Sequence, residues 1–461
     1  MQDPGVIQLL AILVAVTVFL VTLVNTNAAV VLLIFSMLLS PEINMANLPH
    51  RAVAIRFDDL LLGVIFFTWL AKLAMKKELT LIRSTPLNLP LAMFLVSCAI
   101  STGFGLARGY VNGRASFFYL LKYAEYFVLY FMITNVIRDR AQVERFVRML
   151  ILTAIIVSVC GYWQMAHEGL ATRLTAPFEG EHPEPNTLAG YLLLIMGIVL
   201  ARAVYASTIQ QMWRYAGIAA FLFVPFLFTQ SRGGYAAFVV MYLLLVLAAP
   251  RRRKLWLIIP MVVLLIGGLS VLPDVVVKRL QHTFAYSDRS SGYLRSAHVP
   301  HSSRSQQQMI VMERLGLDPS AAARVDVWFV TFEELWDHPF IGYGVTGAGL
   351  VDEQYCLVLG ELGLFGMLVF LWTRWMIYRM GRSVLRDLED PAWRGLVIGY
   401  LCAYTGLLVH SFAGNIFIIV RIMEPFWFLT ALVAALPRIM AEPASVNTLV
   451  LARPVAIPRL A

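Results

Sequence analysis

The sequence predicts an all-α protein that crosses a membrane many times. Of its 461 residues, 59% are hydrophobic and only 14% are charged, and the mean hydropathy is +0.73. A soluble domain carries about 25% charged residues. Apolar runs of about 18 residues follow one another along the chain, which is the pattern of successive membrane helices. Lipid is therefore expected to replace much of the water around this fold.

Twelve or thirteen membrane helices are expected from the order of these runs. We expect them near residues 6–24, 28–40, 60–76, 87–106, 115–136, 147–166, 187–207, 215–230, 233–249, 255–272, 354–378, 395–412 and 418–437. The second run is short, so the sequence leaves open whether it spans. The first run has no basic flank and no cleavage site of small residues, which favours a retained helix over a signal peptide.

Basic residues gather in loops that the helix order places on one side. These loops are Lys72–Arg83, Arg138–Arg148, Arg251–Lys254 and Tyr378–Arg386. Because short cytoplasmic loops are enriched in Lys and Arg, this side is predicted to be the cytoplasm. The net charge of +9 is then an orientation signal, and no basic stripe with interleaved aromatic residues indicates nucleic-acid binding.

Hydrophilic segments divide the chain into four expected parts. Membrane helices occupy 1–272, a large periplasmic loop follows over 273–353, further helices occupy 354–437, and 438–461 form a cytoplasmic tail. The loop is expected to be partly helical, with a mobile, Ser-rich stretch near 286–308. The cysteines lie in or beside apolar runs and predict neither a disulfide framework nor a metal site: Cys98, Cys160, Cys356 and Cys402.

An arginine stands between two apolar runs on the predicted outer side. The run "FLFVPFLFTQ" leads into Ser231-Arg232-Gly233-Gly234, and another apolar run follows. A lone arginine at a helix end can extend to the lipid headgroups. The glycine pair, however, permits close backbone approach, and other outer segments carry further arginines. Several guanidinium groups around one cavity would bind a phosphate or diphosphate.

Four ordered segments resemble the O-antigen ligase and polysaccharide polymerase superfamily. They are "RLTAPFEGEHPEPNTLAGYL", "FTQSRGGYAAF", "RVDVWFVTFEELWDHPFIGYG" and "VDEQYCLVLGELGLFGMLVF", which lie between Arg173 and Phe370. The segment "AIRFDDLLL" near Ile55 adds to the resemblance. Each segment is a weak signal alone, but their order around one long outer loop is more specific. The resemblance implies a glycosyltransferase of the bacterial inner membrane whose active face is periplasmic. Such enzymes take a glycan from undecaprenyl diphosphate, without a nucleotide sugar, metal or other cofactor, and join it to an acceptor sugar.

The resemblance assigns roles to particular arginines. Arg232 would bind the lipid diphosphate and stabilise its negative charge as it leaves. Arg324 matches the arginine of an R-x-x-x-W element and would be a second diphosphate contact. Trp328, one helical turn later, would pack under the same helix face. Arg173, ahead of a predicted helix, is a further candidate contact to the glycan or the diphosphate. The competing interpretation of these arginines is headgroup contact or an ordinary surface ion pair.

The sequence departs from the ligase pattern just before the helix at 354–378. Ligases of the superfamily carry a His-Asn pair there, and that histidine is their proposed acceptor base, whereas this chain reads Asp352-Glu353-Gln354-Tyr355. Asp352 or Glu353 could accept the acceptor's proton, or could cap the helix N-terminus; both interpretations remain open. Gln354 and Tyr355 are predicted to contact the glycan.

Charged residues within apolar runs are expected to form pairs. Lys122 with Glu125, and Arg421 with Glu424, have the i,i+3 spacing of local ion pairs. Glu361 is expected to face the protein interior, because a carboxylate in lipid is costly.

The predicted function is polymerisation of undecaprenyl-diphosphate-linked repeat units, as in exopolysaccharide or O-antigen assembly. A ligase that transfers the glycan to lipid A core or a protein is the alternative, and the missing histidine argues against it. A transporter of lipid-linked sugars would show repeat symmetry, and no repeat is visible. Expected partners are the lipid-linked donor, a sugar acceptor, membrane lipid and, as a further candidate, a chain-length regulator or other assembly protein.

Overall fold

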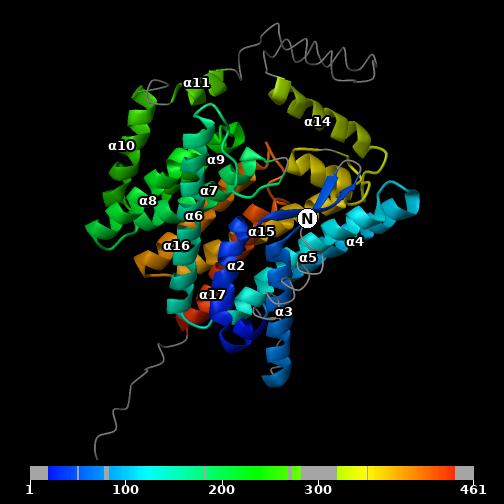
Figure 1. Cartoon of the computed structure of the whole chain (residues 1–461), viewed down its shortest axis with the longest axis horizontal. Helices are drawn as coiled ribbons and strands as arrows, with labels where there is room; N and C mark the ends of the chain where they lie inside the picture. The colour runs from blue at the N-terminus through cyan, green and yellow to red at the C-terminus, as the bar shows by residue number, and fades with distance from the viewer. Residues whose placement is uncertain are drawn as a thin grey trace, which may run out of the picture.

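A bundle of long helices makes up nearly all of the protein (Figure 1). The computed structural model describes residues 19–48, 51–76, 83–180, 183–267, 273–281, 319–349 and 351–441. Within these residues, eight helices are long and apolar enough to cross a membrane. The predicted class, an all-α polytopic membrane protein, is therefore confirmed.

The helices follow the predicted order. The eight long ones are α4 (Asn88–Arg108), α5 (Gly113–Val136), α6 (Arg140–Glu168), α7 (Pro185–Val204), α8 (Ile209–Phe228), α15 (Gln354–Asp387), α16 (Pro391–His410) and α17 (Val420–Ala441). Further helices over the other predicted runs are α2 (Thr26–Leu39), α3 (Phe57–Lys76), α9 (Arg232–Ala248) and α10 (Arg251–Gly267). With 14 residues, α2 rises about 21 Å, less than the roughly 30 Å of a bilayer core.

The region predicted as a large loop contributes two described helices, α11 (Asp274–Gln281) and α14 (Pro319–Leu335). Both lie at the same end of the bundle (Figure 1). The stretch predicted to be mobile, 286–308, lies outside the described residues, as do most of the first predicted helix and the tail beyond Ala441.

A two-stranded hairpin was not predicted. Strands β1 (Glu42–Leu48) and β2 (Arg51–Arg56) pair antiparallel, with Glu42 opposite Arg56. The hairpin joins α2 to α3 and lies against the bundle at the end that carries α14 (Figure 1). The membrane helices on either side dominate the hydropathy pattern, so these short strands give little signal of their own.

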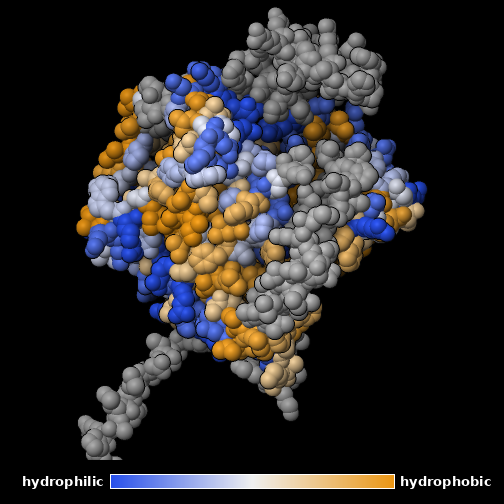
Figure 2. All heavy atoms as spheres, viewed as in Figure 1, coloured by the Kyte–Doolittle hydropathy of each residue, from blue (hydrophilic) through white to orange (hydrophobic). Residues whose placement is uncertain are grey.

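The interior of the bundle is built around α7, α16 and α17. Small residues let α7 and α16 approach closely: a Cβ on Gly399 would lie 2.6 Å from the Gly197 carbonyl oxygen, and a Cβ on Gly197 would lie 2.7 Å from the Ala403 Cβ. Helix association in lipid depends on such close packing, because water does not drive it. Hydrophobic side chains cover much of the visible flank, and hydrophilic ones gather toward the end with α11 and α14 (Figure 2).

Helix α15 is interrupted at Gly363, where φ is 64° and ψ is −167°. The preceding loop supplies hydrogen bonds at the break: the Leu364 N–H donates to the Pro339 carbonyl (2.8 Å) and the Gly344 N–H donates to the Glu361 carbonyl (2.9 Å). The Glu361 side chain is buried and accepts from the Thr346 N–H (2.7 Å). Irregular backbone at membrane depth is tolerated where protein partners satisfy it in this way.

Replacing Gly363 with alanine is expected to destabilise the protein by about 3 kcal/mol or more. The Gly363 backbone lies in a region that only glycine adopts readily, and an added Cβ would lie 2.5 Å from the Phe340 carbonyl carbon. Unfolding of the detergent-solubilised protein by SDS titration measures the change. Gly103→Ala on α4 is the control, because no atom lies within 4 Å of its added Cβ. Equal stability of the two variants would contradict this account of the break.

Candidate active site

Ser231 joins three helices at the start of α9. Its hydroxyl oxygen caps α9 by accepting from the Gly234 N–H (3.1 Å). The hydroxyl also donates to the Asn186 side-chain oxygen at the start of α7 (2.7 Å) and lies 3.4 Å from the His410 Nε2 at the end of α16. The N-terminus of α9, which carries the positive end of its dipole, is thereby held in place, and Arg232 is the next residue.

Gly233, the first glycine after Arg232, lies where close packing leaves no room for a side chain. A Cβ at this position would lie 2.5 Å from the Ala413 Cβ and 3.0 Å from the His410 Cδ2. The first turn of α9 therefore packs directly against the turn after α16, and a larger residue would move Arg232.

Three arginines lie near one another at this end of the bundle. Arg173 is half-buried, and its Nε donates to the Thr229 carbonyl (3.3 Å), just ahead of α9. Burial lowers the pKa of Arg173, and the positive charges of Arg279 on α11 and Arg232 lower it further. Guanidinium groups that repel one another in this way form a site suited to an anion with several oxygens, such as a phosphate.

Arg324 on α14 faces Glu353, the residue that immediately precedes α15. The Arg324 Nε lies 3.7 Å from the Glu353 Oε1, and the Glu353 side chain is 0% exposed. Neither carboxylate oxygen of Glu353 has a hydrogen-bond partner within the described residues. Burial raises the pKa of Glu353 to about 7, and the charge of Arg324 partly opposes that rise.

The two candidate carboxylates, Asp352 and Glu353, differ in their exposure to solvent. Asp352 is exposed, whereas Glu353 is buried beside Arg324. Glu353 occupies the N-cap position of α15 but its side chain makes no capping hydrogen bond. The capping interpretation is therefore wrong for Glu353, because its carboxylate faces Arg324.

The turn at residues 410–412 connects the two parts of the site. His410 lies beside Ser231, the Ser411 carbonyl accepts from the Gln354 N–H (3.2 Å), and the ring of Phe412 stacks with that of Trp328 at 6.4 Å between centroids. Three consecutive residues thus contact the elements that carry Arg232, Glu353 and Arg324.

Gln354 and Tyr355 have partners within the protein. The Gln354 side-chain oxygen accepts from the Phe417 N–H (2.8 Å), and this residue is 1% exposed. The Gln354 side-chain oxygen is therefore engaged within the protein, and whether Gln354 contacts glycan stays a prediction. The Tyr355 hydroxyl donates to the Leu408 carbonyl (2.8 Å), and its ring packs on Phe412; whether Tyr355 contacts glycan stays a prediction.

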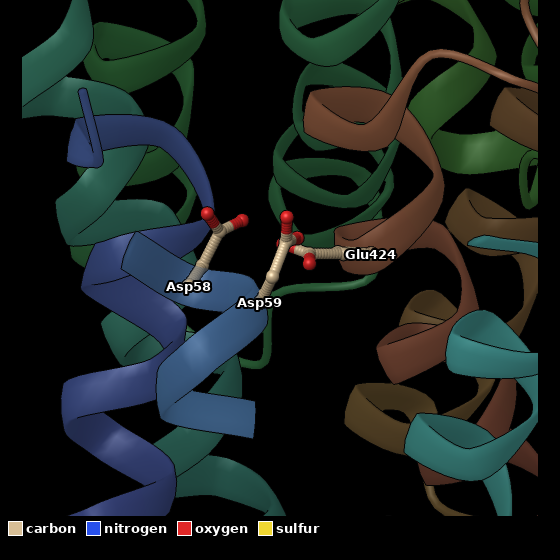
Figure 3. Close-up of side chains that lie close together, drawn as sticks. All are labelled: Asp58, Asp59 and Glu424. Atoms are coloured by element: carbon tan, nitrogen blue, oxygen red, sulfur yellow. The ribbon is translucent and has the colours of Figure 1, made fainter. Parts of the chain in front are cut away.

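A second polar cluster lies between α3 and α17 (Figure 3). The carboxylate oxygens of Asp58, Asp59 and Glu424 lie within 4.8 Å of one another. Such a set could hold a metal ion, but basic side chains already pair with it. Arg56 Nη2 lies 2.8 Å from Asp58, and Lys122 pairs with Asp59. The protein's own cations therefore offset part of the negative charge and tie α3 to its neighbours.

Of the two predicted local ion pairs, one is present. Lys122 lies 3.1 Å from Glu125, as predicted. Arg421 instead pairs with Glu42 at 3.2 Å, so the predicted Arg421–Glu424 pair is wrong. The reason is burial, because Arg421 is 2% exposed. It donates to carbonyls at the end of α2 and in the segment before α7, those of Leu38, Ser40, Pro177 and Phe178.

Residues 216–371 match the family model described as O-antigen ligase. Over this segment the chain is similar to the O-antigen ligase family. A comparison with curated proteins finds no match.

The matched segment supplies only part of the site. It contains Arg232, Arg324 and Glu353, whereas Asn186 and His410 lie on helices outside it. Sequence reasoning missed Asn186, His410 and Arg279 as site residues. The available signals were a histidine at the predicted outer end of a helix and a basic residue early in the long loop, and neither is specific.

Proposed function

We propose that this protein polymerises undecaprenyl-diphosphate-linked oligosaccharide repeat units at the periplasmic face of the inner membrane. The observation that carries the proposal is a buried carboxylate beside one arginine, joined through the turn at 410–412 to a start of α9 that carries another. The charges of Arg232 and Arg279 both lower the pKa of Arg173, and Arg324 faces Glu353. The match to an O-antigen ligase domain supports glycosyl transfer as the chemistry.

The arginines would act on the leaving group. When the bond between the anomeric carbon and the diphosphate oxygen breaks, its electron pair stays on that oxygen. Arg232 and Arg173, together with the N-terminus of α9, would stabilise the resulting negative charge. The Ser231 contacts hold the N-terminus of α9, and Arg173 donates to the Thr229 carbonyl, so little reorganisation is needed during the reaction.

Glu353 would act on the acceptor. Its ionised carboxylate accepts the proton of the acceptor hydroxyl as the hydroxyl oxygen bonds to the anomeric carbon. A pKa of about 7 suits this role, because a base works best with a pKa near the working pH. Arg324 would hold the carboxylate in position and favour its ionised form.

A reconstituted assay tests the proposal. Purified protein in liposomes receives the lipid-linked repeat unit without nucleotide or metal, and products are separated by gel and mass spectrometry. A ladder of lengthening glycan is expected. Single transfer that requires added lipid A core or protein would show a ligase instead. No product with any acceptor would contradict glycosyl transfer and would favour transport.

Gly233→Ala is expected to slow transfer by about tenfold to a hundredfold while the protein stays folded. The added methyl group would collide with Ala413 and His410 and shift Arg232, and a misplacement of about 1 Å can cost about a hundredfold in rate. Gly217→Ala on α8 is the control, because no atom lies within 4 Å of its added Cβ. A Gly233 variant as active as the control would contradict the packing argument.

A further inference from the structure

An apolar cavity lies beside the middle of α9, where Phe238 and Leu243 are among its lining residues. Its volume is about 580 Å³, and side chains of α7, α8, α9 and α10 line it. The lining is apolar and aromatic except for Arg253, the charged residue among its described walls. Such a volume falls within the range of ligand pockets, about 300–1,000 Å³.

The cavity separates α10 from the body of the bundle. Helix α10 stands at the margin of the molecule (Figure 1), and side chains of α10 that do not line the cavity are exposed, with Leu255 at 64% and Val263 at 54%. An empty apolar space would deprive its walls of dispersion contacts. In a bilayer, the hydrocarbon available to fill a space between two membrane helices is an acyl chain.

A run of basic residues begins α10, and one of them, Arg253, lines this cavity. Arg251, Arg252, Arg253 and Lys254 begin α10, where the helix dipole adds further positive charge. None of the four forms an ion pair within the described part of the chain. Arg253 reaches across to α8, with its Nη1 2.6 Å from the Met212 sulfur.

Two tryptophans that line the cavity indicate how deep it lies in the membrane. Trp213 on α8 and Trp256 on α10 pack edge to face, 5.5 Å between centroids, and both line the cavity. They are 57% and 48% exposed. Tryptophan favours the boundary between hydrocarbon and headgroups. The basic run Arg251–Lys254, which precedes Trp256 in α10, therefore lies at headgroup level.

We propose that this cavity binds an anionic glycerophospholipid of the cytoplasmic leaflet. One acyl chain would lie between α8 and α10, and the phosphate would lie against the Arg251–Lys254 run. Basic pockets between membrane helices on the cytoplasmic side suit anionic headgroups. This inference is independent of the proposed transferase activity, because neither Arg232 nor Glu353 lines the cavity.

Native mass spectrometry of the detergent-solubilised full chain tests the proposal. Phosphatidylglycerol and phosphatidylcholine with the same acyl chains are titrated separately. We expect phosphatidylglycerol to bind about tenfold more tightly. The triple variant R251Q/R252Q/K254Q should remove most of that preference. The matched triple R379Q/R382Q/R386Q, three exposed arginines near the end of α15, should retain it.

The acyl-chain part of the proposal has its own variants. Ala220→Trp fills the cavity from α8 and should weaken binding of both lipids at least fivefold. Gly217→Trp places the same side chain on α8 where no atom lies within 4 Å of the Cβ, and should not. Equal affinity for the two lipids, or equal losses in the two triple variants, would overturn the proposal. Binding of undecaprenyl phosphate without binding of phosphatidylglycerol would overturn it as well.

Discussion

Arg232→Ala is expected to lower the rate of glycan transfer about a thousandfold while the protein stays folded. In the proposed reaction, Arg232 stabilises charge that develops only as the diphosphate leaves, and removing one such preorganised donor costs about 10²–10³-fold in rate. The side chain lies at the rim of the bundle and not in its packed core, being only partly buried. The initial rate of product formation in the liposome assay measures the change, with circular dichroism to verify folding.

Two further variants separate a diphosphate contact from a general charge effect. Arg232→Lys keeps the charge but loses the planar pair of donors, so it should recover only part of the rate. Arg114→Ala removes an exposed arginine at the same end of the bundle and should transfer at close to the normal rate. If Arg232→Ala and Arg114→Ala were equally active, Arg232 would not bind the leaving group.

Glu353→Gln is expected to lower transfer about a hundredfold to ten-thousandfold, the range over which a general base acts. The amide keeps the size of the side chain but cannot accept the acceptor's proton. Asp352→Asn is the matched control, because Asp352 is exposed while Glu353 is buried beside Arg324. A large loss in Asp352→Asn, with little loss in Glu353→Gln, would reverse the assignment of the base.

The pH dependence of transfer gives an independent test of Glu353. The carboxylate must be ionised to act as a base, so the rate should rise with pH through about 7. Arg324 lowers the pKa of Glu353; Arg324→Ala should therefore move this rise to higher pH. A rising limb that stays in place in Arg324→Ala would mean that another group titrates.

The free energy of unfolding shows whether Glu353→Gln is inactive because it lacks the base or because it is unfolded. The pKa of Glu353 is raised from 4.5 to about 7 in the folded protein, so the folded state holds this proton more tightly than the unfolded chain does. Stability from this group is present below about pH 4.5 and is lost as the pH rises to about 7. Glu353→Gln has no proton to lose, so its stability does not fall in this way as the pH rises. The inactive variant should therefore be at least as stable as the wild type at pH 8.

The sequence located the helices well because each membrane segment must bury its own backbone polar groups within itself. Hydropathy therefore reports α4 through α10 and α15 through α17 without knowledge of their neighbours. The hairpin of β1 and β2 was missed because it depends on pairing between segments, and not on the hydropathy of either one. The break in α15 was missed for a related reason, since the loop at 339–344 supplies its hydrogen bonds.

The candidate site was only partly predictable. Arg232 and Arg324 were found because their segments resemble known motifs. The sequence could not show whether Asp352 or Glu353 is the base. The two are adjacent carboxylates, and only the folded structure determines which side chain is buried beside Arg324. Arg421 has its partner Glu42 on a distant strand, so the i,i+3 spacing to Glu424 was misleading.

By itself, the sequence determined that this chain is a membrane bundle with an O-antigen ligase-like order of segments, and which of its loops are basic. Those properties depend on each segment's own interaction with lipid and water. Only the tertiary structure decided that the turn at 410–412 joins Ser231, Gln354 and Trp328, and that Glu353 is buried beside Arg324. Such contacts are made between segments far apart in the chain. They therefore form, and contribute to stability, only when the helices pack into the bundle.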